Sequence, residues 1–377
     1  MKIAFYAPMK PPDHPVPSGD RQMARALLRA LALAGFDVLV ASRFRSYSAK
    51  PAEQALAEHA RPELDRLLAM WRDANQRPGL WITYHPYYRA PDFLGPEIAG
   101  RLDIPYVTIE ASYAGKRDRD AWSEMQAAVV RGIEAAALNI CFTAADREGL
   151  SRIVGDDRLA DLPPFIDAQP FATAERGERH GPVRLLTVAM MRGGVKLQSY
   201  DMLGRALSLI ANEPWILTVV GDGPERPRVE AAFAGFPSSR VSWAGETPPE
   251  AVVRHLSEAD VFVWPGTGEA YGIAYLEAQA AGLPVVAQAT HGVPAVVRHG
   301  ETGLLTTPGD DRAYAEAIAK LIHDERLRQG LGRAARRFVQ GERSLPAAAA
   351  RLRGLLEPLL SNSGPPFGSS PQPTGIL

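Results

Sequence analysis

The sequence predicts two α/β domains, each a doubly wound parallel sheet, and three observations support this fold class. The chain has 377 residues, which at about 150 residues per domain suits two or three domains. Short apolar runs alternate with amphipathic stretches, an order typical of a parallel sheet covered by helices on both faces. The alternation stops at the polar, aperiodic segment 167–181 and then resumes, so we expect an interdomain linker there.

Each half of the chain contains six apolar runs with helical patterns between them. In the first half we expect strands at 2–7, 37–42, 80–84, 105–109, 138–143 and 159–166, with helices at 21–34, 53–75, 122–137 and 145–153. In the second half we expect strands at 184–189, 216–220, 241–244, 261–264, 285–287 and 303–306, with helices at 197–212, 226–234, 248–259, 272–281, 311–323 and 325–339.

These elements divide the chain into two Rossmann-like domains, at 1–170 and 181–343. A last helix within 346–360 is expected to pack back on the first domain. The tail 361–377 contains no charged residue and is rich in Ser, Gly and Pro, so we expect it to be disordered.

Composition excludes several classes of protein. The 42 basic and 43 acidic residues give a net charge of −1, which argues against a nucleic-acid partner. A single Cys excludes an internal disulfide and a Cys-rich zinc site, and we expect no metal. The apolar start of the chain is too short for a targeting signal, and no run of 18 apolar residues is present. We therefore expect a cytoplasmic protein with at most peripheral membrane contact.

The segment 269–277 carries the most specific chemical pattern. Glu269 and Glu277 are eight residues apart, and a helix that begins near Gly272 places the first in a loop and the second inside the helix. Eight helical residues span about 12 Å, comparable to the distance from a sugar through a diphosphate to a ribose. The backbone N–H groups of Tyr271, Gly272 and Ile273 suit an anion at the helix N-terminus. The alternative is that both glutamates are solvated surface carboxylates.

The longer string EAYGIAYLEAQAAGLPVVA, residues 269–287, resembles the signature of family 4 glycosyltransferases, which have the GT-B fold of two Rossmann-like domains facing a central cleft. VVGDGPER at 219–226 and GETGLLTTPGD at 300–310 resemble further motifs of that family. The resemblance is strong over about 180–340.

The resemblance implies a role for each matching residue in the second domain. Glu269 would contact the donor sugar, Glu277 would bind the ribose hydroxyls, and the amides of residues 271–273 would hold the diphosphate. Gly221 and Gly223 would belong to the same donor site.

The family usually has an Arg and a Lys after the first strand of the second domain, and this chain departs from that pattern. Met190 stands in the usual Arg place, and the loop to Lys196 is one residue longer. We expect Lys196 and Arg192 to stabilise the leaving diphosphate, since both supply positive charge. Solvated surface cations are the alternative for both.

The first domain is expected to hold the acceptor. The family has a Gly-rich loop here, which corresponds to Ser18 and Gly19, with Gly19 next to the donor. Ser18 and Asp20 are assigned to the acceptor region, although either equally suits a plain helix N-cap. The row Arg21, Arg25 and Arg29 is interpreted as a solvated helix face, with anionic lipid or acceptor contact as the minority alternative.

Many relatives place a His after the fourth strand, near the reacting sugar, and this chain has none there. Glu110 ends that strand and His85 follows the third, so the base or positioning role stays open between them. Three further side chains are assigned to the acceptor region: Tyr113, Lys116 and Arg117.

The resemblance implies a retaining glycosyltransferase of hexosyltransferase type that acts in glycan biosynthesis. The donor would be a UDP-, GDP- or dTDP-sugar, and the acceptor a saccharide, a lipid-linked or a small-molecule hydroxyl. A nucleoside-diphosphate-sugar hydrolase or phosphorylase-like enzyme of the same fold is one alternative. A non-catalytic sugar-binding subunit, suggested by Met190, is another.

Overall fold

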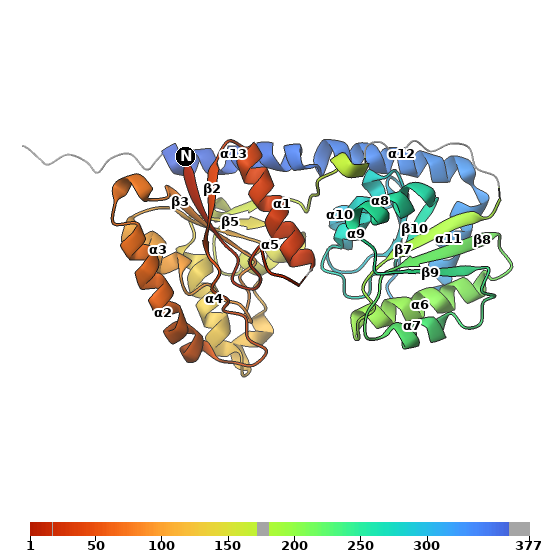
Figure 1. Ribbon diagram of the computed structural model, residues 1–377, viewed down its shortest axis with the longest axis horizontal. Coiled ribbons are helices and arrows are strands. Elements are labelled where there is room, and N and C mark those ends of the chain that lie inside the picture. The colour runs from red at the N-terminus through yellow and green to blue at the C-terminus, as the bar shows by residue number, and fades with distance from the viewer. Residues whose placement is uncertain (17, 172–180, 362–377) are drawn as a thin grey trace, which may run out of the picture.

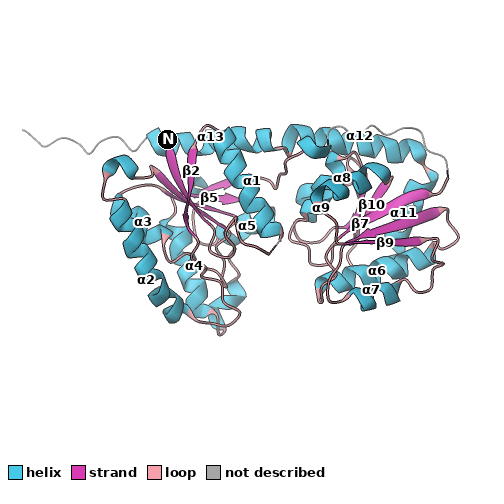
Figure 2. Cartoon of the chain, viewed as in Figure 1, coloured by secondary structure: helices cyan, strands magenta, loops and turns pink. Residues whose placement is uncertain are grey.

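Two lobes, each a six-stranded parallel sheet between helices, make up the computed structural model (Figures 1 and 2). The structure describes residues 1–16, 18–171 and 181–361. Strand order is β2-β1-β3-β4-β5-β6 in the first sheet and β12-β11-β10-β7-β8-β9 in the second, and every strand pair is parallel. The predicted fold class is confirmed.

The first lobe is built from six strands and five longer helices of the described chain. They are β1 (Lys2–Tyr6), α1 (Gly19–Leu33), β2 (Asp37–Ser42), α2 (Glu53–Met70), β3 (Leu80–Tyr84), α3 (Gly95–Leu102), β4 (Tyr106–Ile109), α4 (Ser123–Ala135), β5 (Leu138–Cys141), α5 (Ala144–Leu150) and β6 (Leu159–Asp161).

The second lobe repeats this alternation. It contains β7 (Val183–Val188), α6 (Val195–Leu209), β8 (Trp215–Val220), α7 (Arg226–Ala232), β9 (Val241–Gly245), α8 (Pro249–Glu258), β10 (Val261–Val263), α9 (Ile273–Ala280), β11 (Val285–Gln288), α10 (Val293–Val296), β12 (Gly303–Thr306), α11 (Asp311–His323) and α12 (Glu325–Glu342), and α13 (Leu345–Ser361) then follows.

Strand β1 shows why the first sheet has helices on both faces. Successive side chains of a strand point to opposite faces. Ile3 and Phe5 pack in the core that includes residues of α1 and α13, whereas Ala4 and Tyr6 pack in a second core formed with α2 and α3. All four are fully buried, so the strand is continuously apolar rather than alternating.

Helix α3 is absent from the expected elements, and β6 ends at Asp161 rather than at 166. The missed helix has only eight residues, too few for a clear periodic pattern. Its start is fixed by Asp92, whose carboxylate accepts hydrogen bonds from the backbone N–H groups of Leu94 and Gly95, at 2.8 Å each. Asp92 ahead of Pro96 was the available signal.

The last two helices run along one side of both lobes (Figure 1). Helix α13 lies against α1 of the first lobe, where Arg353 Nε donates a 2.7 Å hydrogen bond to the Ala34 carbonyl. Residues 172–180 of the expected linker and 362–377 of the expected disordered tail lie outside the described residues. The domain boundaries therefore stay predictions. In the described part of the chain, no helix combines the length and the apolar character needed to cross a membrane.

Candidate active site

The two lobes contact each other through side chains near the carboxyl ends of their strands. Gln22 Nε2, on α1, donates a 2.8 Å hydrogen bond to Glu277 Oε1, on α9. The rings of Phe142, after β5, and Tyr271, before α9, meet edge to face with centroids 6.0 Å apart. Ligands of open parallel sheets bind outside the carboxyl ends of the strands. We therefore call the residues at these strand ends, in both lobes, the interlobe site.

Each lobe forms one wall of this site, and the wall of the second lobe contains an ion pair. Lys196 Nζ lies 2.6 Å from Glu269 Oε2, and their side chains are only 24% and 18% exposed. Lys196 is the second residue of α6 and Glu269 lies in the loop after β10, so tertiary structure joins residues 73 positions apart. The ammonium group also lies 5.4 Å from the centroid of the Trp264 ring. The pair holds a cation and a carboxylate in fixed positions beside the start of α9.

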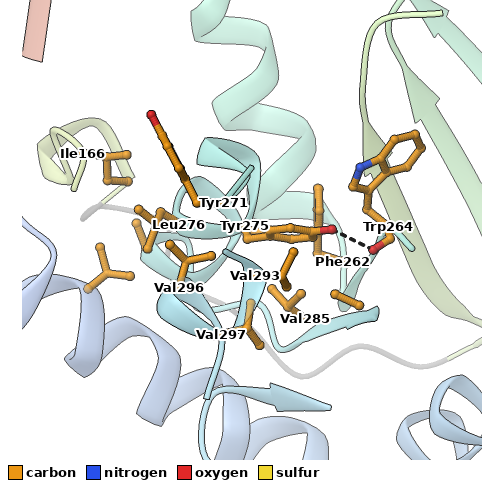
Figure 3. Close-up of a cluster of buried hydrophobic side chains, with 14 of the residues drawn as sticks. Ile166, Phe262, Trp264, Tyr271, Tyr275, Leu276, Val285, Val293, Val296 and Val297 are labelled. Carbon is orange, nitrogen blue, oxygen red and sulfur yellow. Dashed lines mark hydrogen bonds between the residues drawn. The ribbon is translucent and has the colours of Figure 1, made fainter. Parts of the chain in front are cut away.

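Helix α9 begins where the sequence predicted, with Gly272 as its N-cap in a left-handed conformation (φ 78°). A Cβ at that position would lie 2.6 Å from the Tyr275 ring, so only glycine fits. Tyr275 is itself held by a 3.0 Å hydrogen bond from its hydroxyl to the Trp264 carbonyl (Figure 3). Residues of β10, β11 and α10 pack around it, and this core fixes the helix N-terminus.

The glycines of the VVGDGPER motif let two loops pack backbone against backbone. A Cβ on Gly221 would lie 2.0 Å from the Ala189 carbonyl oxygen, and one on Gly223 would lie 2.3 Å from that of Met191. Met191 N–H donates to the Asp222 carbonyl at 2.9 Å, which fastens the loop after β7 to the loop after β8. These contacts give the motif a packing role, whereas its donor-binding role stays a prediction.

The loop after β7 leaves Arg192 exposed beside its two glycines. Met190, in the usual Arg place, is also a surface residue, 37% exposed. Lys196 thus lies at the start of α6 beside Glu269, whereas Arg192 is exposed on the preceding loop, where its charge acts on Lys10 of the first lobe.

Two strained residues form the first lobe's wall. His85 and Glu110 directly follow the neighbouring strands β3 and β4, and both have positive φ, 56° and 57°. Non-glycine residues seldom adopt this conformation, and such strain is concentrated at functional sites. His85 Nδ1 lies 3.0 Å from Asp20 Oδ1, on α1. Buried Glu110 Oε2 and the buried Tyr84 hydroxyl have no hydrogen-bond partner among the described residues.

The charges of this wall act on one another. Burial alone would lower the pKa of His85, but the charge of Glu110 and the hydrogen bond and charge of Asp20 raise it to about 9. Burial raises the pKa of the Glu110 carboxyl to about 7, against the opposing charge of His85. Burial works to raise the pKa of Asp20, but the hydrogen bond and charge of His85, a backbone hydrogen bond and the charge of Lys10 together lower it by more, so the net shift of the pKa is downward. Titratable side chains with shifted pKa values thus lie at the ends of β3 and β4.

The open choice at the start of α1 is resolved by its hydrogen bonds. Ser18 is the N-cap, since its hydroxyl accepts from Arg21 N–H at 3.2 Å. Asp20 does not cap the helix and binds His85 instead. Gly19 faces the second lobe, and a Cβ there would lie 4.0 Å from Cδ1 of Ile273.

The arginine row of α1 is not a purely solvated face. Arg21 donates to the carbonyls of His14 and Pro15, at 2.7 and 3.1 Å, and Arg25 donates to that of Pro12 at 2.7 Å. A third arginine, Arg29, pairs with Asp167 at 2.8 Å. The first two hold the proline-rich loop over the start of α1.

The other predicted acceptor residues lie on the segment after β4. Tyr113 donates to Asp118, Lys116 is exposed, and Arg117 pairs with Asp120 at 2.7 Å. Arg117 is linked to His85 through Tyr88 and Tyr87, which the sequence did not single out. Gln22 was also missed, because an exposed polar residue on a helix gives no sequence signal.

Burial raises the pKa of the Glu277 carboxyl, and the hydrogen bond from Gln22 lowers it in part. The two glutamates of the sequence motif therefore meet different partners. Glu269 has a cation of its own lobe, and Glu277 has an amide of the other lobe. The donor-binding roles of both glutamates stay predictions.

Residues 182–324 match a family model described as glycosyl transferases group 1. A GDP-mannose-dependent alpha-(1-6)-phosphatidylinositol monomannoside mannosyltransferase of Mycobacterium tuberculosis is 32% identical over 214 residues, which cover 52% of this chain and 55% of that protein. The chain spans between about a fifth and three fifths of the length of these curated relatives.

Solved structures share the fold over almost the whole chain. Sucrose-phosphate synthase of Thermosynechococcus elongatus superposes with a TM-score of 0.73, at 22% identity, over 96% of this chain and 100% of that one. Anabaena Alr3699/HepE in complex with UDP superposes with a TM-score of 0.71, at 16% identity, over 95% of this chain and 100% of that one. At these identities the likeness shows the two-lobed fold.

Proposed function

We propose that this chain, which contains a group 1 glycosyl transferase domain at residues 182–324, is a retaining hexosyltransferase. It moves a sugar from a nucleoside-diphosphate sugar to an acceptor hydroxyl. The observation that carries the proposal is the Lys196–Glu269 ion pair, 2.6 Å long, beside the N-terminus of α9. A fixed cation and a helix N-terminus together suit a diphosphate that gains charge as it leaves.

The proposed reaction is a front-face displacement. The bond between the anomeric carbon and the β-phosphate oxygen breaks. The acceptor oxygen forms its bond to that carbon on the same face of the sugar, and the acceptor's proton passes to the departing phosphate oxygen. The configuration at the anomeric carbon is therefore kept, and the protein contributes orientation and electrostatic stabilisation.

Each wall of the interlobe site has its own part in this reaction. Lys196, Arg192 and the amides at residues 271–273 stabilise the leaving diphosphate. Glu269 orients the donor sugar and Glu277 binds the ribose hydroxyls. On the other wall, the strained and charged pair of His85 and Glu110 positions the reacting groups, with Asp20 holding the His85 ring.

The donor is a UDP-, GDP- or dTDP-sugar. Two findings support a nucleotide donor: the mannosyltransferase relative is named as GDP-mannose-dependent, and the Alr3699/HepE structure is a complex with UDP. The acceptor is a saccharide, lipid-linked or small-molecule hydroxyl, held by the lobe at 1–170, while the lobe at 181–343 holds the donor. We place the protein in the cytoplasm, with at most peripheral membrane contact.

A binding test comes first. UDP, GDP and dTDP, each at rising concentration, are added to the full chain and the unfolding temperature is measured. One of them is expected to raise it in a concentration-dependent way, because a ligand of the native state stabilises that state. No shift with any of the three would contradict the proposal.

Turnover is measured next, with UDP-glucose and GDP-mannose among the donors. Nucleotide release that depends on an added acceptor indicates transfer, and release without one indicates hydrolysis. The anomeric configuration of the product, read by NMR, tests retention. Glu269→Gln is expected to lose turnover, while Glu250→Gln, an exposed glutamate of α8, is the matched control.

A further inference from the structure

A strip of aromatic and arginine side chains extends from His85 along the first lobe. We call Tyr87, Tyr88, Trp122, Arg89 and Arg117 the aromatic strip. The His85 and Tyr87 rings are stacked, with centroids 5.1 Å apart and planes 30° apart. Tyr88 meets Tyr87 edge to face at 5.4 Å and meets Trp122 in the same way at 5.1 Å. The strip therefore starts at the reacting end of the interlobe site.

The turn that carries the strip is held on both sides. Ala90 N–H donates to the Tyr87 carbonyl at 2.7 Å, and Tyr87 N–H donates to the Ala90 carbonyl at 3.3 Å. Ser48 N–H donates to the Arg89 carbonyl at 2.9 Å. Tyr88 and Arg89 thus lie at the tip of a closed turn, and their positions are set before any ligand arrives.

Two guanidinium groups lie on the aromatic faces. Arg117 lies 4.4 Å from the centroid of the Tyr88 ring and also pairs with Asp120. Arg89 lies 5.4 Å from the centroid of the Trp122 ring and 5.6 Å from that of Tyr88. Arg89 forms no ion pair with a carboxylate among the residues that the structure describes, and its Nε atom has no hydrogen-bond partner there.

Burial of part of a charged group costs free energy unless the buried atom is paired. The Arg89 Nε atom is buried and lacks an acceptor. Contact with the two rings recovers only part of that cost. An anionic ligand that reaches the guanidinium would offset the remaining free-energy cost. The half-buried rings of Tyr88 and Trp122 offer faces for the C–H groups of a sugar ring.

We propose that the aromatic strip is the acceptor subsite and that it takes a sugar ring bearing a carboxylate or a phosphate. This inference rests on the proposed function and names the chemistry of the acceptor. The ring stacks on Tyr88 and Trp122, and the anionic group binds Arg89, with Arg117 adding positive charge. A hydroxyl of the same acceptor then points along Tyr87 toward His85.

Matched sugars test the anionic group. Methyl β-D-glucuronide and methyl β-D-glucoside differ only at C6, and glucose 6-phosphate and glucose form the corresponding phosphate pair. Binding to the full chain, saturated with the nucleotide that stabilises it, is measured by calorimetry. The anionic member of at least one pair is expected to bind at least tenfold more tightly, and the pair that shows the difference tells carboxylate from phosphate.

Three variants test the residues. Arg89→Gln is expected to abolish the preference for the anionic sugar, and Trp122→Ala to weaken both members of the pair several-fold. Arg101→Gln, an exposed arginine of α3 in the same lobe, is expected to keep the wild-type pattern. Arg89→Lys keeps the positive charge. If this variant retains part of the preference for the anionic sugar, the loss in Arg89→Gln comes from the missing charge and not from misfolding.

Three outcomes would overturn the inference: no binding of any of the four sugars, equal binding within both pairs, or an unchanged preference in Arg89→Gln. Nucleotide binding is measured on the same samples. If the nucleotide still binds while the sugars fail, the acceptor subsite is wrong and the proposed function stands. If the nucleotide also fails to bind, the proposed function itself falls.

Discussion

The two walls of the interlobe site are built in different ways. The second lobe's wall relies on glycines, which let loops and the start of α9 pack closely, and it contains a single compact ion pair, Lys196–Glu269. The first lobe's wall has strained non-glycine residues, His85 and Glu110, whose charges are partly buried and interact with Asp20. The comparison teaches that close backbone packing shapes the second wall, whereas the first wall depends on side chains held in strained and buried positions.

The largest expected effect tests the charged part of the second wall. Lys196→Ala should lower kcat about 100- to 1,000-fold, because a positive charge that stabilises the leaving group is lost. Steady-state kinetics measure this, and Lys320→Ala, an exposed lysine of α11, is the control. Lys196→Arg should keep more activity than the alanine variant. Unchanged turnover in Lys196→Ala would show that the charge of Lys196 does not stabilise the leaving group.

The backbone part of the same wall is tested by Gly223→Ala. The left-handed conformation (φ 155°) and the 2.3 Å approach to the Met191 carbonyl should make this change cost on the order of 3 kcal/mol of stability. Urea unfolding measures it. Gly330→Ala, inside α12 with open space around it, should stabilise slightly, since alanine favours a helix. Equal effects of both changes would show that the loop packing is not a constraint.

The first wall is tested by the pH dependence of stability. His85 has a folded-state pKa of about 9 against an ordinary 6.5, so its contribution is fully present below about pH 6.5 and is lost as pH rises through 9. Between pH 6 and 9.5 the wild type should lose on the order of 2 kcal/mol more free energy of unfolding than His85→Gln. The Glu110 pKa of about 7 adds to the fall between about pH 4.5 and 7, so it lies mostly below this window.

Urea unfolding at both pH values measures the difference, and His59→Gln, an exposed histidine of α2, serves as control. If wild type and His85→Gln lose the same free energy over this range, the charges of Glu110 and Asp20 do not stabilise the protonated imidazole.

The smallest effect concerns the contact between the walls. Gln22→Ala removes the hydrogen bond to Glu277, worth about 1 kcal/mol, and frees the carboxylate for a ribose. Nucleotide affinity, measured by calorimetry, should rise up to about fivefold. Gln329→Ala removes a similar bond to Glu325 within α12 and should leave affinity unchanged. Weaker binding in Gln22→Ala would mean that Gln22 positions Glu277 rather than competing for it.

The second lobe was easier to predict than the first. Its motif residues are close in sequence, so the loop and the helix that begins after Gly272 could be placed from local patterns alone. The glycines at 221 and 223 were also visible, although the packing that requires them was not. In the first lobe, the eight-residue helix α3 gave too little periodicity to be found.

The pairing of His85 with Asp20 could not be predicted, because it joins a strand end to a helix 65 residues earlier. The aromatic strip was hidden for the same reason. Tyr88 and Trp122 are 34 positions apart in the chain, and only the fold brings their rings to 5.1 Å.

The sequence by itself determined the alternation of strands and helices, the two lobes and the family resemblance of segment 269–287, because these depend on local periodicity and on residues within one loop and helix. Tertiary structure decided which side chains meet: Lys196 with Glu269, Gln22 with Glu277, and His85 with Asp20. It also decided the pKa shifts of His85 and Glu110, since burial and nearby charge shift a pKa only after distant segments have packed together.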